Sequence, residues 1–219
     1  MNKKIEIEKD NLLLVEGNDD QNFFQKLIEE IELDDIQTIP MGGKDNFKTP
    51  NLKTVKNISG FNRVKALGIV RDADDNADNV FKSICTILKE CGLPEPARPM
   101  EITNTPLRVG ILIIPPSATK GEIEDICLAS LKGYSEMECI DAYFRCLKSS
   151  LSTEKFPKKL SKAKIQAFLA SRENSVPNLG LAAQRNYFPL DHDVFKEIKK
   201  FLRLLFKDGS KIITSEKKD

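Results

Sequence analysis

The hydrophobic pattern of the first half of the chain switches repeatedly between short apolar runs and helical repeats. The short runs predict buried strands over residues 11–15, 35–40, 65–70 and 108–115. Apolar residues recur at helical spacing over residues 18–31 and from Ala77 to Cys91, with a weaker repeat over 48–62. Continuous apolar strands alternating with amphipathic helices are typical of a parallel sheet covered on both faces.

The pattern changes after Pro116, where no further strand is indicated. Helical spacing then predicts helices over residues 121–131, 135–148, 162–171 and 193–206. We therefore predict an α/β fold with a mostly parallel four-stranded sheet flanked by helices, and a helical C-terminal portion. In this division residues 1–132 form the α/β core and residues 133–219 a helical extension packed on it, with a frayed tail from residue 207.

Charge and length exclude several broad classes of protein. The 219 residues include 34 basic and 33 acidic side chains, a formal charge of +1, so bulk positive charge does not hold a nucleic acid here. No window approaches the roughly 18 apolar residues of a membrane span. The N-terminal sequence MNKKIEIEKDN has no apolar stretch after its lysines, so we expect no secretory signal and a cytoplasmic location.

Cysteine and histidine usage narrows the possible chemistry. The five cysteines include no C-x-x-C pair and the chain has a single histidine, His192, which argues against a structural zinc site. Hydrolysis by Ser–His–Asp or Cys–His would depend on that one histidine. Hydrolytic chemistry in this chain is therefore better served by a metal ion and carboxylates.

Acidic residues follow the strand predicted over residues 65–70. Side chains alternate along a strand, so Asp72 and Asp74 are expected to project to one side, at the edge of the sheet where ligands gather. Two carboxylates there suit Mg²⁺ or Mn²⁺. The alternative is that these residues cap the helix that begins near Asn76.

Acidic residues also follow the first and last predicted strands. Glu16 ends the first strand, Gly17 permits a sharp turn, and Asp20 lies four residues after Glu16 on roughly the same helical face, with Asn18 or Asp19 as the expected cap. After the last strand, Gly121 precedes an acidic turn in which Glu124 is expected to face the same edge, ahead of Glu122 and Asp125. The alternative for this turn is the preference of helix N-termini for acidic residues.

The segments LLLVEGNDDQNFF and ALGIVRDADDN together resemble the Toprim domain, whose pattern is Glu-Gly after the first strand and Asp-x-Asp after the third. The segment GEIEDICL is similar to small stand-alone Toprim proteins allied to the overcoming-lysogenization-defect (OLD) nucleases. These motifs cover residues 11 to about 130. The resemblance implies a nuclease that hydrolyses phosphodiester bonds with two Mg²⁺ or Mn²⁺ ions. It implies these ligands: Glu16, Asp72 and Asp74 around one ion, and Asp20 and Glu124 toward the second.

Other Toprim activities need parts that this chain lacks. Topoisomerases need a separate domain with a nucleophilic tyrosine, primases and recombination mediators carry zinc elements, and OLD nucleases carry an ATPase domain with a G-x-x-x-x-G-K-[ST] loop. The resemblance therefore implies a Toprim catalytic domain without accessory domains. Such a domain would act in phage defence or DNA repair with an ATPase partner encoded elsewhere. A homodimer and a nucleic-acid substrate, DNA rather than RNA, are the other partners we expect, with no membrane.

Lysines are candidates for neutralising the phosphate. The segment KFPKKLSKAK, residues 155–164, carries five lysines beside an aromatic residue and could follow a phosphate backbone or be a solvated linker. The candidate nucleic-acid-binding lysines are Lys44, Lys120, Lys158, Lys159 and Lys162, and the candidate catalytic lysine is Lys164. Two alternatives to a nuclease stay open: a non-catalytic regulatory or interaction subunit, and a metal-dependent phosphotransfer enzyme acting on nucleotides.

Overall fold

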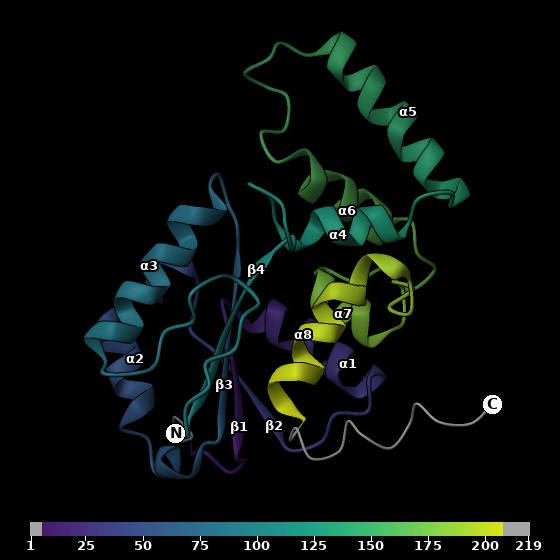
Figure 1. The fold of residues 1–219 in the computed structure, drawn as a ribbon. Coiled ribbons are helices and arrows are strands. Elements are labelled where there is room, and N and C mark those ends of the chain that lie inside the picture. The colour runs from purple at the N-terminus through teal and green to yellow at the C-terminus, as the bar shows by residue number, and fades with distance from the viewer. Residues whose placement is uncertain (1–5, 208–219) are drawn as a thin grey trace, which may run out of the picture.

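The computed structural model describes residues 6–207, and a parallel sheet forms its centre (Figure 1). Its strands lie in the order β2-β1-β3-β4, each parallel to its neighbours. Their bounds are Asn11–Val15 (β1), Ile36–Pro40 (β2), Ala66–Asp72 (β3) and Arg108–Ile114 (β4). The predicted α/β class with a four-stranded sheet is confirmed. Of the tail expected to fray, all residues beyond Lys207 lie outside the described range.

Helices connect the strands and make up the chain after β4. The first three are α1 (Asn18–Glu30), α2 (Thr49–Lys56) and α3 (Ala77–Glu90). The later ones are α4 (Ile123–Ser130), α5 (Ser135–Ser150), α6 (Leu160–Ala170), α7 (Leu179–Gln184) and α8 (Lys196–Phe206). Short 3-10 helices are η1 (Lys44–Asn46), η2 (Phe61–Arg63) and η3 (Asp193–Phe195). Within residues 6–207, none of these helices is long and apolar enough to cross a bilayer.

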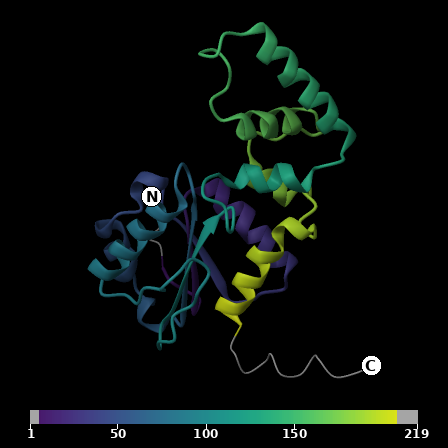
Figure 2. The ribbon, with the colours of Figure 1, turned by 45° about the horizontal axis from the view of Figure 1, so that its top comes forward.

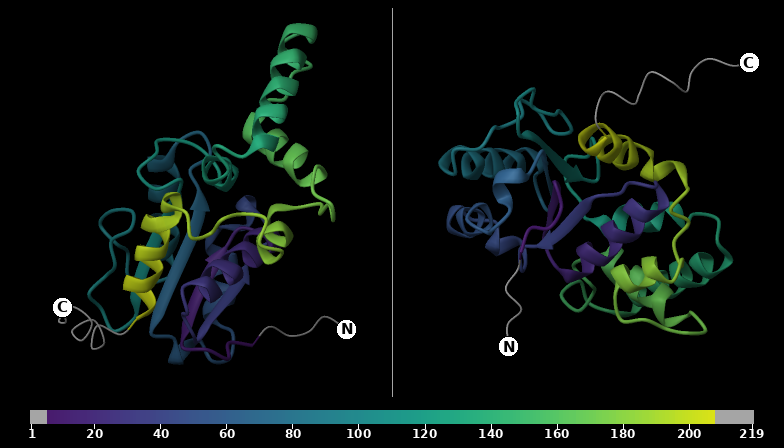
Figure 3. Two further views of the ribbon diagram at one scale, coloured as in Figure 1. Left: turned by 90° about the vertical axis from the view of Figure 1, so that its right-hand side faces the viewer. Right: turned by 90° about the horizontal axis from the view of Figure 1, so that it is seen from below.

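Different helices cover the two faces of the sheet. Alternate strand residues point to opposite faces, so β1 contributes Leu12 and Leu14 to one core and Leu13 and Val15 to the other. Helices α2 and α3 cover the first face, and α1 and α8 cover the second (Figure 3). The strands are therefore buried on both sides, which explains their uninterrupted apolar sequence.

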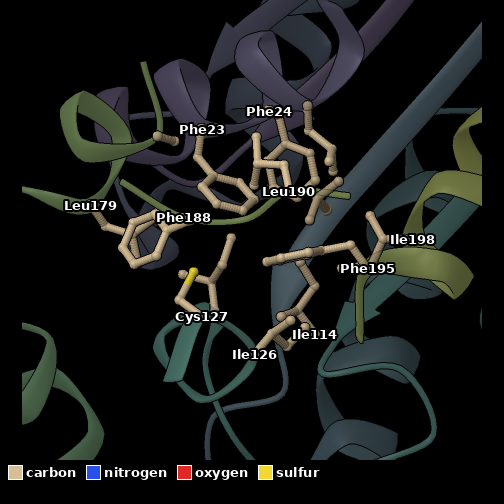
Figure 4. Packing of buried hydrophobic residues seen from close by; sticks show 14 of the residues in the cluster. Phe23, Phe24, Ile114, Ile126, Cys127, Leu179, Phe188, Leu190, Phe195 and Ile198 are labelled. Carbon is tan, nitrogen blue, oxygen red and sulfur yellow. The ribbon is translucent and has the colours of Figure 1, made fainter. Parts of the chain in front are cut away.

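The C-terminal helices share one core with the sheet. Phe195 of η3 packs on Phe23 of α1 with ring centroids 6.1 Å apart, and Phe23 meets the edge of Phe24 at 5.5 Å. Figure 4 shows these rings between α1 and the η3–α8 segment, with Ile126 and Cys127 of α4 on the remaining side. This packing fixes α4, and with it the acidic turn that precedes α4, against the end of the sheet.

Helix α5 stands away from the rest of the molecule (Figures 1 and 2). It buries one face, with Met137, Ile140 and Phe144, and packs on α6. The loop that follows α5 returns to the end of the sheet, where Lys159 forms an ion pair with Glu122. This ion pair therefore holds the loop between α5 and α6 beside the acidic end of the sheet.

The helix caps differ from the sequence expectations. The N-cap of α1 is Gly17, in an extended conformation, instead of Asn18 or Asp19. The Gly17 N–H donates to Asp20 Oδ2 at 2.9 Å, as in a capping box. The side chain of the third helical residue therefore caps the start of α1. At α3, Asn76 is the cap: its side chain accepts a hydrogen bond from Asn79 N at 2.9 Å.

Candidate active site at the ends of β1 and β3

The carboxyl ends of β1 and β3 are neighbours in the sheet, and the chain order reverses between them. β2 pairs with β1 on one side, while β3 and β4 lie on the other. Such a switch point leaves a crevice where ligands of open α/β sheets bind. Glu16 follows β1 directly and Asp72 is the last residue of β3.

Glu16 and Asp72 are in direct contact. Glu16 Oε1 accepts a hydrogen bond from the Asp72 backbone N–H at 3.2 Å and another from Arg71 Nε at 2.6 Å. A cation shared by the two carboxylates requires this closeness. The first two acidic segments identified in the sequence therefore meet.

Asp20 joins them from the first turn of α1. Burial raises the pKa of its carboxyl to about 6, with smaller contributions from the negative charges of Glu16, Asp19 and Glu124 and an opposing one from the Gly17 N–H. Within the described residues, Oδ2 accepts the Gly17 hydrogen bond and Oδ1 accepts none. One carboxylate oxygen is thus available in the site.

Asp72 is the most strongly perturbed of the acids. Its Oδ1 accepts a hydrogen bond from the Ile123 N–H, the first of α4, at 3.0 Å, so the side chain helps to cap that helix and not α3. Burial, followed by the charges of Glu16, Asp20, Glu124 and Glu122, holds its pKa well above the ordinary range. No cation offsets this charge among the described residues.

These acids line a small cavity with an apolar floor. Glu16, Asp20 and Asp72, together with Arg71, surround about 10 Å³ of space. The rest of the lining is Val15, Phe24, Val70, Ile114 and Ile123. That volume is roughly the space of one water molecule. The apolar floor accounts for the raised pKa values, because it withdraws solvent from the carboxylates.

Glu124 lies close by, in the first turn of α4, but does not line the cavity. Burial raises its pKa, with Glu122 and Asp19 adding to the rise and the peptide hydrogen bond and Lys162 opposing it. Its charge acts on Asp72 and Asp20. The third acidic segment thus reaches the same edge of the sheet.

Asp74 is placed differently from the sequence expectation. β3 ends at Asp72, and Asp74 has a φ of 48°, so strand alternation does not aim its side chain. It forms a bridge with Gly121 and ion pairs with Lys44 at 3.2 Å and Arg71 at 3.7 Å. The remaining acids of the loop, Asp75 and Asp78, are exposed.

Arg71 is a site residue that sequence reasoning missed. Its side chain is 10% exposed, pairs with both Glu16 and Asp74, and stacks on the Phe47 ring at 4.9 Å from the centroid. A buried arginine needs such partners. The available signal was an arginine inside an apolar strand, immediately before the Asp-x-Asp pair.

The candidate lysines divide between the site and the surface. Lys44 pairs with Asp74, Lys159 pairs with Glu122, and Lys162 lowers the pKa of Glu124, so these three lie on the acidic rim. Lys120 and Lys158 are exposed. Lys164 pairs with Asp141 of α5 at 2.6 Å, and within residues 6–207 it has no ion pair with the carboxylates of the site.

His192 and the thiols have structural positions. His192 caps η3, where its Nδ1 accepts a hydrogen bond from Val194 N at 3.2 Å. Cys91 and Cys127 are buried. Within residues 6–207, no group of three or more His, Cys, Asp or Glu side chains stands, in its present orientation, close enough to hold a metal ion.

Comparison with known proteins gives a family and two distant structural similarities. Two structures of the C-terminal region of the OLD protein of Xanthomonas campestris pv. campestris are similar to this chain. The first has a TM-score of 0.45 and 15% identity, over 90% of this chain and 95% of that one. The second has a TM-score of 0.41 and 14% identity, over 90% and 98%.

No curated protein matches the sequence. A family model does match, over residues 10–207, which includes the whole sheet, the acidic site and the helices through α8. The chain belongs to the family described as "Protein of unknown function (DUF3226)".

Proposed function

We propose that the acidic site at the ends of β1 and β3 binds Mg²⁺ or Mn²⁺ and that the protein is a nuclease that hydrolyses phosphodiester bonds of DNA. One observation carries the proposal: Glu16, Asp20 and Asp72, from separate elements, converge on one cavity, and Asp20 and Asp72 lack a cation partner among the described residues. Uncompensated buried carboxylates with raised pKa values are costly, and they concentrate at functional sites.

The donor set fits a hard divalent ion. Carboxylate oxygens are the preferred ligands of Mg²⁺ and Mn²⁺, and the free oxygens of Asp20 and Asp72 are available. Glu16, Asp20 and Asp72 would hold the ion, with Glu124 as a ligand toward a second and Asp74 on the rim. When bound, such ions neutralise phosphate charge and lower the pKa of a bound water. Small rotations of these side chains are required, since they do not form a closed ligand set as they stand.

The protein's own residues orient the ligands and supply positive charge. Arg71 holds Glu16 by a 2.6 Å contact and fixes its orientation toward Asp72. Lys44, Lys159 and Lys162 bring positive charge to the rim, where phosphate oxygens would lie.

The small size of the cavity bears on the substrate class. Sites that enclose a small-molecule ligand have volumes of roughly 300–1,000 Å³, whereas the acidic cavity measures about 10 Å³. The phosphate therefore has to bind at the open rim, which suits a backbone phosphate of a strand better than an enclosed nucleotide. An ATPase partner supplied by another chain, and a role in phage defence or DNA repair, belong to the same proposal.

Cleavage assays test the proposal. Plasmid DNA, single-stranded DNA and RNA are incubated with the protein and Mg²⁺ or Mn²⁺, with EDTA as the control. Asp72→Asn keeps an acceptor for the Ile123 N–H but removes the charge, so we expect cleavage to fall by at least about a hundredfold. Asp75→Asn, an exposed acid of the same loop, and His192→Ala are matched controls that should retain activity.

Equal cleavage by the parent and Asp72→Asn would contradict the mechanism, as would full activity in EDTA. A second candidate, a non-catalytic interaction module, is favoured by the ion pairs Arg71–Glu16 and Lys44–Asp74, which already neutralise part of the site. That candidate predicts no cleavage under any of these conditions and no effect of divalent ions on stability.

A further inference from the structure

A second cavity lies at the same end of the sheet, beside the carboxyl end of β4. It measures about 320 Å³ and shares no lining residue with the acidic cavity in the described structure. Its wall comes from the start of α3, from the loop that follows β4, and from residues 99–100. The last two lie beside the edge of β4, where the Met100 N–H donates to the Ile111 carbonyl oxygen at 2.7 Å. Sites that enclose a small molecule have volumes of roughly 300–1,000 Å³, so this cavity can take a group that the acidic cavity is too small to hold.

The end of β4 separates this cavity from the acidic one. Ile114 lines the acidic cavity and pairs with Asp72 in the register of β3 and β4. Ile113 points to the opposite face of the sheet and lines the second cavity. The chain that leaves Asp72 enters the wall of the second cavity at Asn76. A ligand that lies across the end of β4 can therefore reach both cavities.

Two loops form the barrier between the cavities, and hydrogen bonds join them. The Asp74 carbonyl oxygen accepts from the Gly121 N–H at 2.9 Å, and the Thr119 carbonyl oxygen accepts from the Ala77 N–H at 2.8 Å. These bonds hold the loop after β3 against the loop after β4. Lys120, the residue between Thr119 and Gly121, is exposed, so its ammonium group is available to a phosphate that passes from one cavity to the other.

The composition of the wall favours an uncharged group with apolar faces. The larger side chains of the wall are apolar: Pro99, Met100, Ile113, Pro115 and Pro116. In the described structure no lysine or arginine lines the cavity, and Asp78 adds a negative charge. A phosphate inside the cavity would therefore be repelled. A nucleobase is flat and uncharged, and its π-face packs on apolar and thioether side chains.

Polar groups in the same wall suit the edge of a base. Asn76 Oδ1 accepts the capping hydrogen bond from Asn79 N, which leaves the Asn76 Nδ2 group as a donor. The Asp78 carboxylate has no hydrogen bond or ion pair within residues 6–207. Guanine presents two adjacent donors, N1–H and the N2 amino group, to the two oxygens of a carboxylate, whereas thymine presents one donor between two carbonyl oxygens. The wall therefore favours guanine over thymine.

We propose that this cavity binds one unpaired base, guanine in preference to thymine, of the DNA strand whose phosphate lies at the acidic site. The inference rests on the proposed nuclease function and deepens it by naming the form of the substrate. A base has to leave its pair and its stack to enter a cavity, and the cost is least where it is already unpaired. The substrate is therefore single-stranded DNA or a frayed end.

Strand binding without metal tests the cavity separately from cleavage. Fluorescence anisotropy in EDTA measures the affinity of octathymidylates in which a single guanine is moved from position to position. At one position guanine should bind about tenfold more tightly than thymine, because two hydrogen bonds to one carboxylate discriminate between bases. Asp78→Asn should remove this preference. Asp75→Asn, an exposed acid of the same loop that does not line the cavity, should keep it.

Filling the cavity provides a second variant. Ala118 lines the cavity from the loop after β4, so Ala118→Trp should also remove the preference for guanine, and an unchanged melting temperature shows that this variant folds. The absence of a guanine preference at every position would overturn the proposal, as would a preference that persists in both Asp78→Asn and Ala118→Trp.

Free guanosine distinguishes the two sources of a base. Guanosine binding that depends on Asp78, without any guanine preference in the strands, would overturn the assignment to DNA and assign the cavity to a free nucleotide. A guanine preference in EDTA, in a protein that cleaves no DNA with Mg²⁺ or Mn²⁺, would contradict the proposed nuclease and support the base site alone.

Discussion

Carboxylates of two electrostatic kinds lie side by side at the carboxyl end of the sheet. Glu16, Asp74 and Glu122 each have a basic partner, in Arg71, Lys44 and Lys159 respectively. Asp20, Asp72 and Glu124 instead have raised pKa values, with burial as the first cause in each. The paired acids are stabilised by the fold, while the others oppose it whenever they are ionised.

The raised pKa of Asp20 predicts how the free energy of unfolding depends on pH. Its carboxyl has a pKa of about 6 in the fold against an ordinary 3.8, so the folded protein binds the proton more tightly than the unfolded chain. The associated stability is present below the unfolded value and is lost as pH rises through about 6. In EDTA at pH 8, Asp20→Asn should therefore raise the free energy of unfolding, by at most about 3 kcal/mol. Urea denaturation at pH 8 and pH 5 checks this, and the gain should shrink at pH 5.

Asp20→Asn removes the charge and keeps the hydrogen bond, because the Asn side-chain oxygen can still accept from the Gly17 N–H. Asp75→Asn removes an exposed charge from the neighbouring loop and should leave stability nearly unchanged at both pH values. A destabilised Asp20→Asn protein at pH 8 would show that the carboxylate is stabilising and that its pKa is not raised.

Sequence reasoning located the acids of the site better than its bases. Glu16, Asp20 and Asp72 were identified because they follow strands that end at one edge, and the structure brings them to one cavity. Arg71 was missed because periodicity treats it as an interruption of an apolar strand. Its partners, Asp74 and Phe47, are set by a turn and by a loop before α2, and neither position follows from local pattern.

At the scale of elements, α7 depends on its contact with α1. Residues 179–184 are too few for a helical repeat, and no helix was predicted there. The Asp19 side chain accepts hydrogen bonds from the Leu179 and Gly180 N–H groups, so the first turn of α7 is held by the first turn of α1. The longer helices, whose apolar repeats cover several turns, were predictable because their own sequence specifies the buried face.

Gly180 allows this close approach. A Cβ at that position would lie 2.2 Å from the Asp19 carbonyl oxygen. Helix propensity alone would make Gly180→Ala stabilising by about 1 kcal/mol, but the clash forces α7 away from α1. We therefore expect the opposite sign, a loss of about 1–3 kcal/mol of unfolding free energy in urea denaturation.

Gly17→Ala is the matched control for that change. Gly17 has an extended backbone, and a Cβ there would have its nearest contact at 3.7 Å, an ordinary distance. Its stability should fall by no more than about 1 kcal/mol, the cost of alanine in place of glycine at an N-cap. If Gly180→Ala is as stable as the parent or more so, the two helices do not approach as closely as described.

At the scale of the whole molecule, the proposed metal ion would link the site to the stability of the fold. The sheet, α1 and α4 meet at the acidic cavity, so an ion bound there joins elements that separate on unfolding. A ligand that binds only the folded state stabilises it by about 2.7 kcal/mol at one hundred times its dissociation constant. For a chain of this size, that corresponds to a rise in melting temperature of roughly 5–10 °C.

The order of stability between the parent and Asp20→Asn should therefore reverse with metal. In EDTA at pH 8 the variant is the more stable, because it lacks a buried charge. With Mn²⁺ or Mg²⁺ at saturating concentration the parent gains the binding free energy, and Asp20→Asn, which has lost a ligand charge, gains less. Differential scanning fluorimetry over a metal titration measures both curves, with Asp75→Asn expected to follow the parent. Parallel curves for the parent and Asp20→Asn would place the ion elsewhere, and a parent that does not respond to either metal would favour the non-catalytic module.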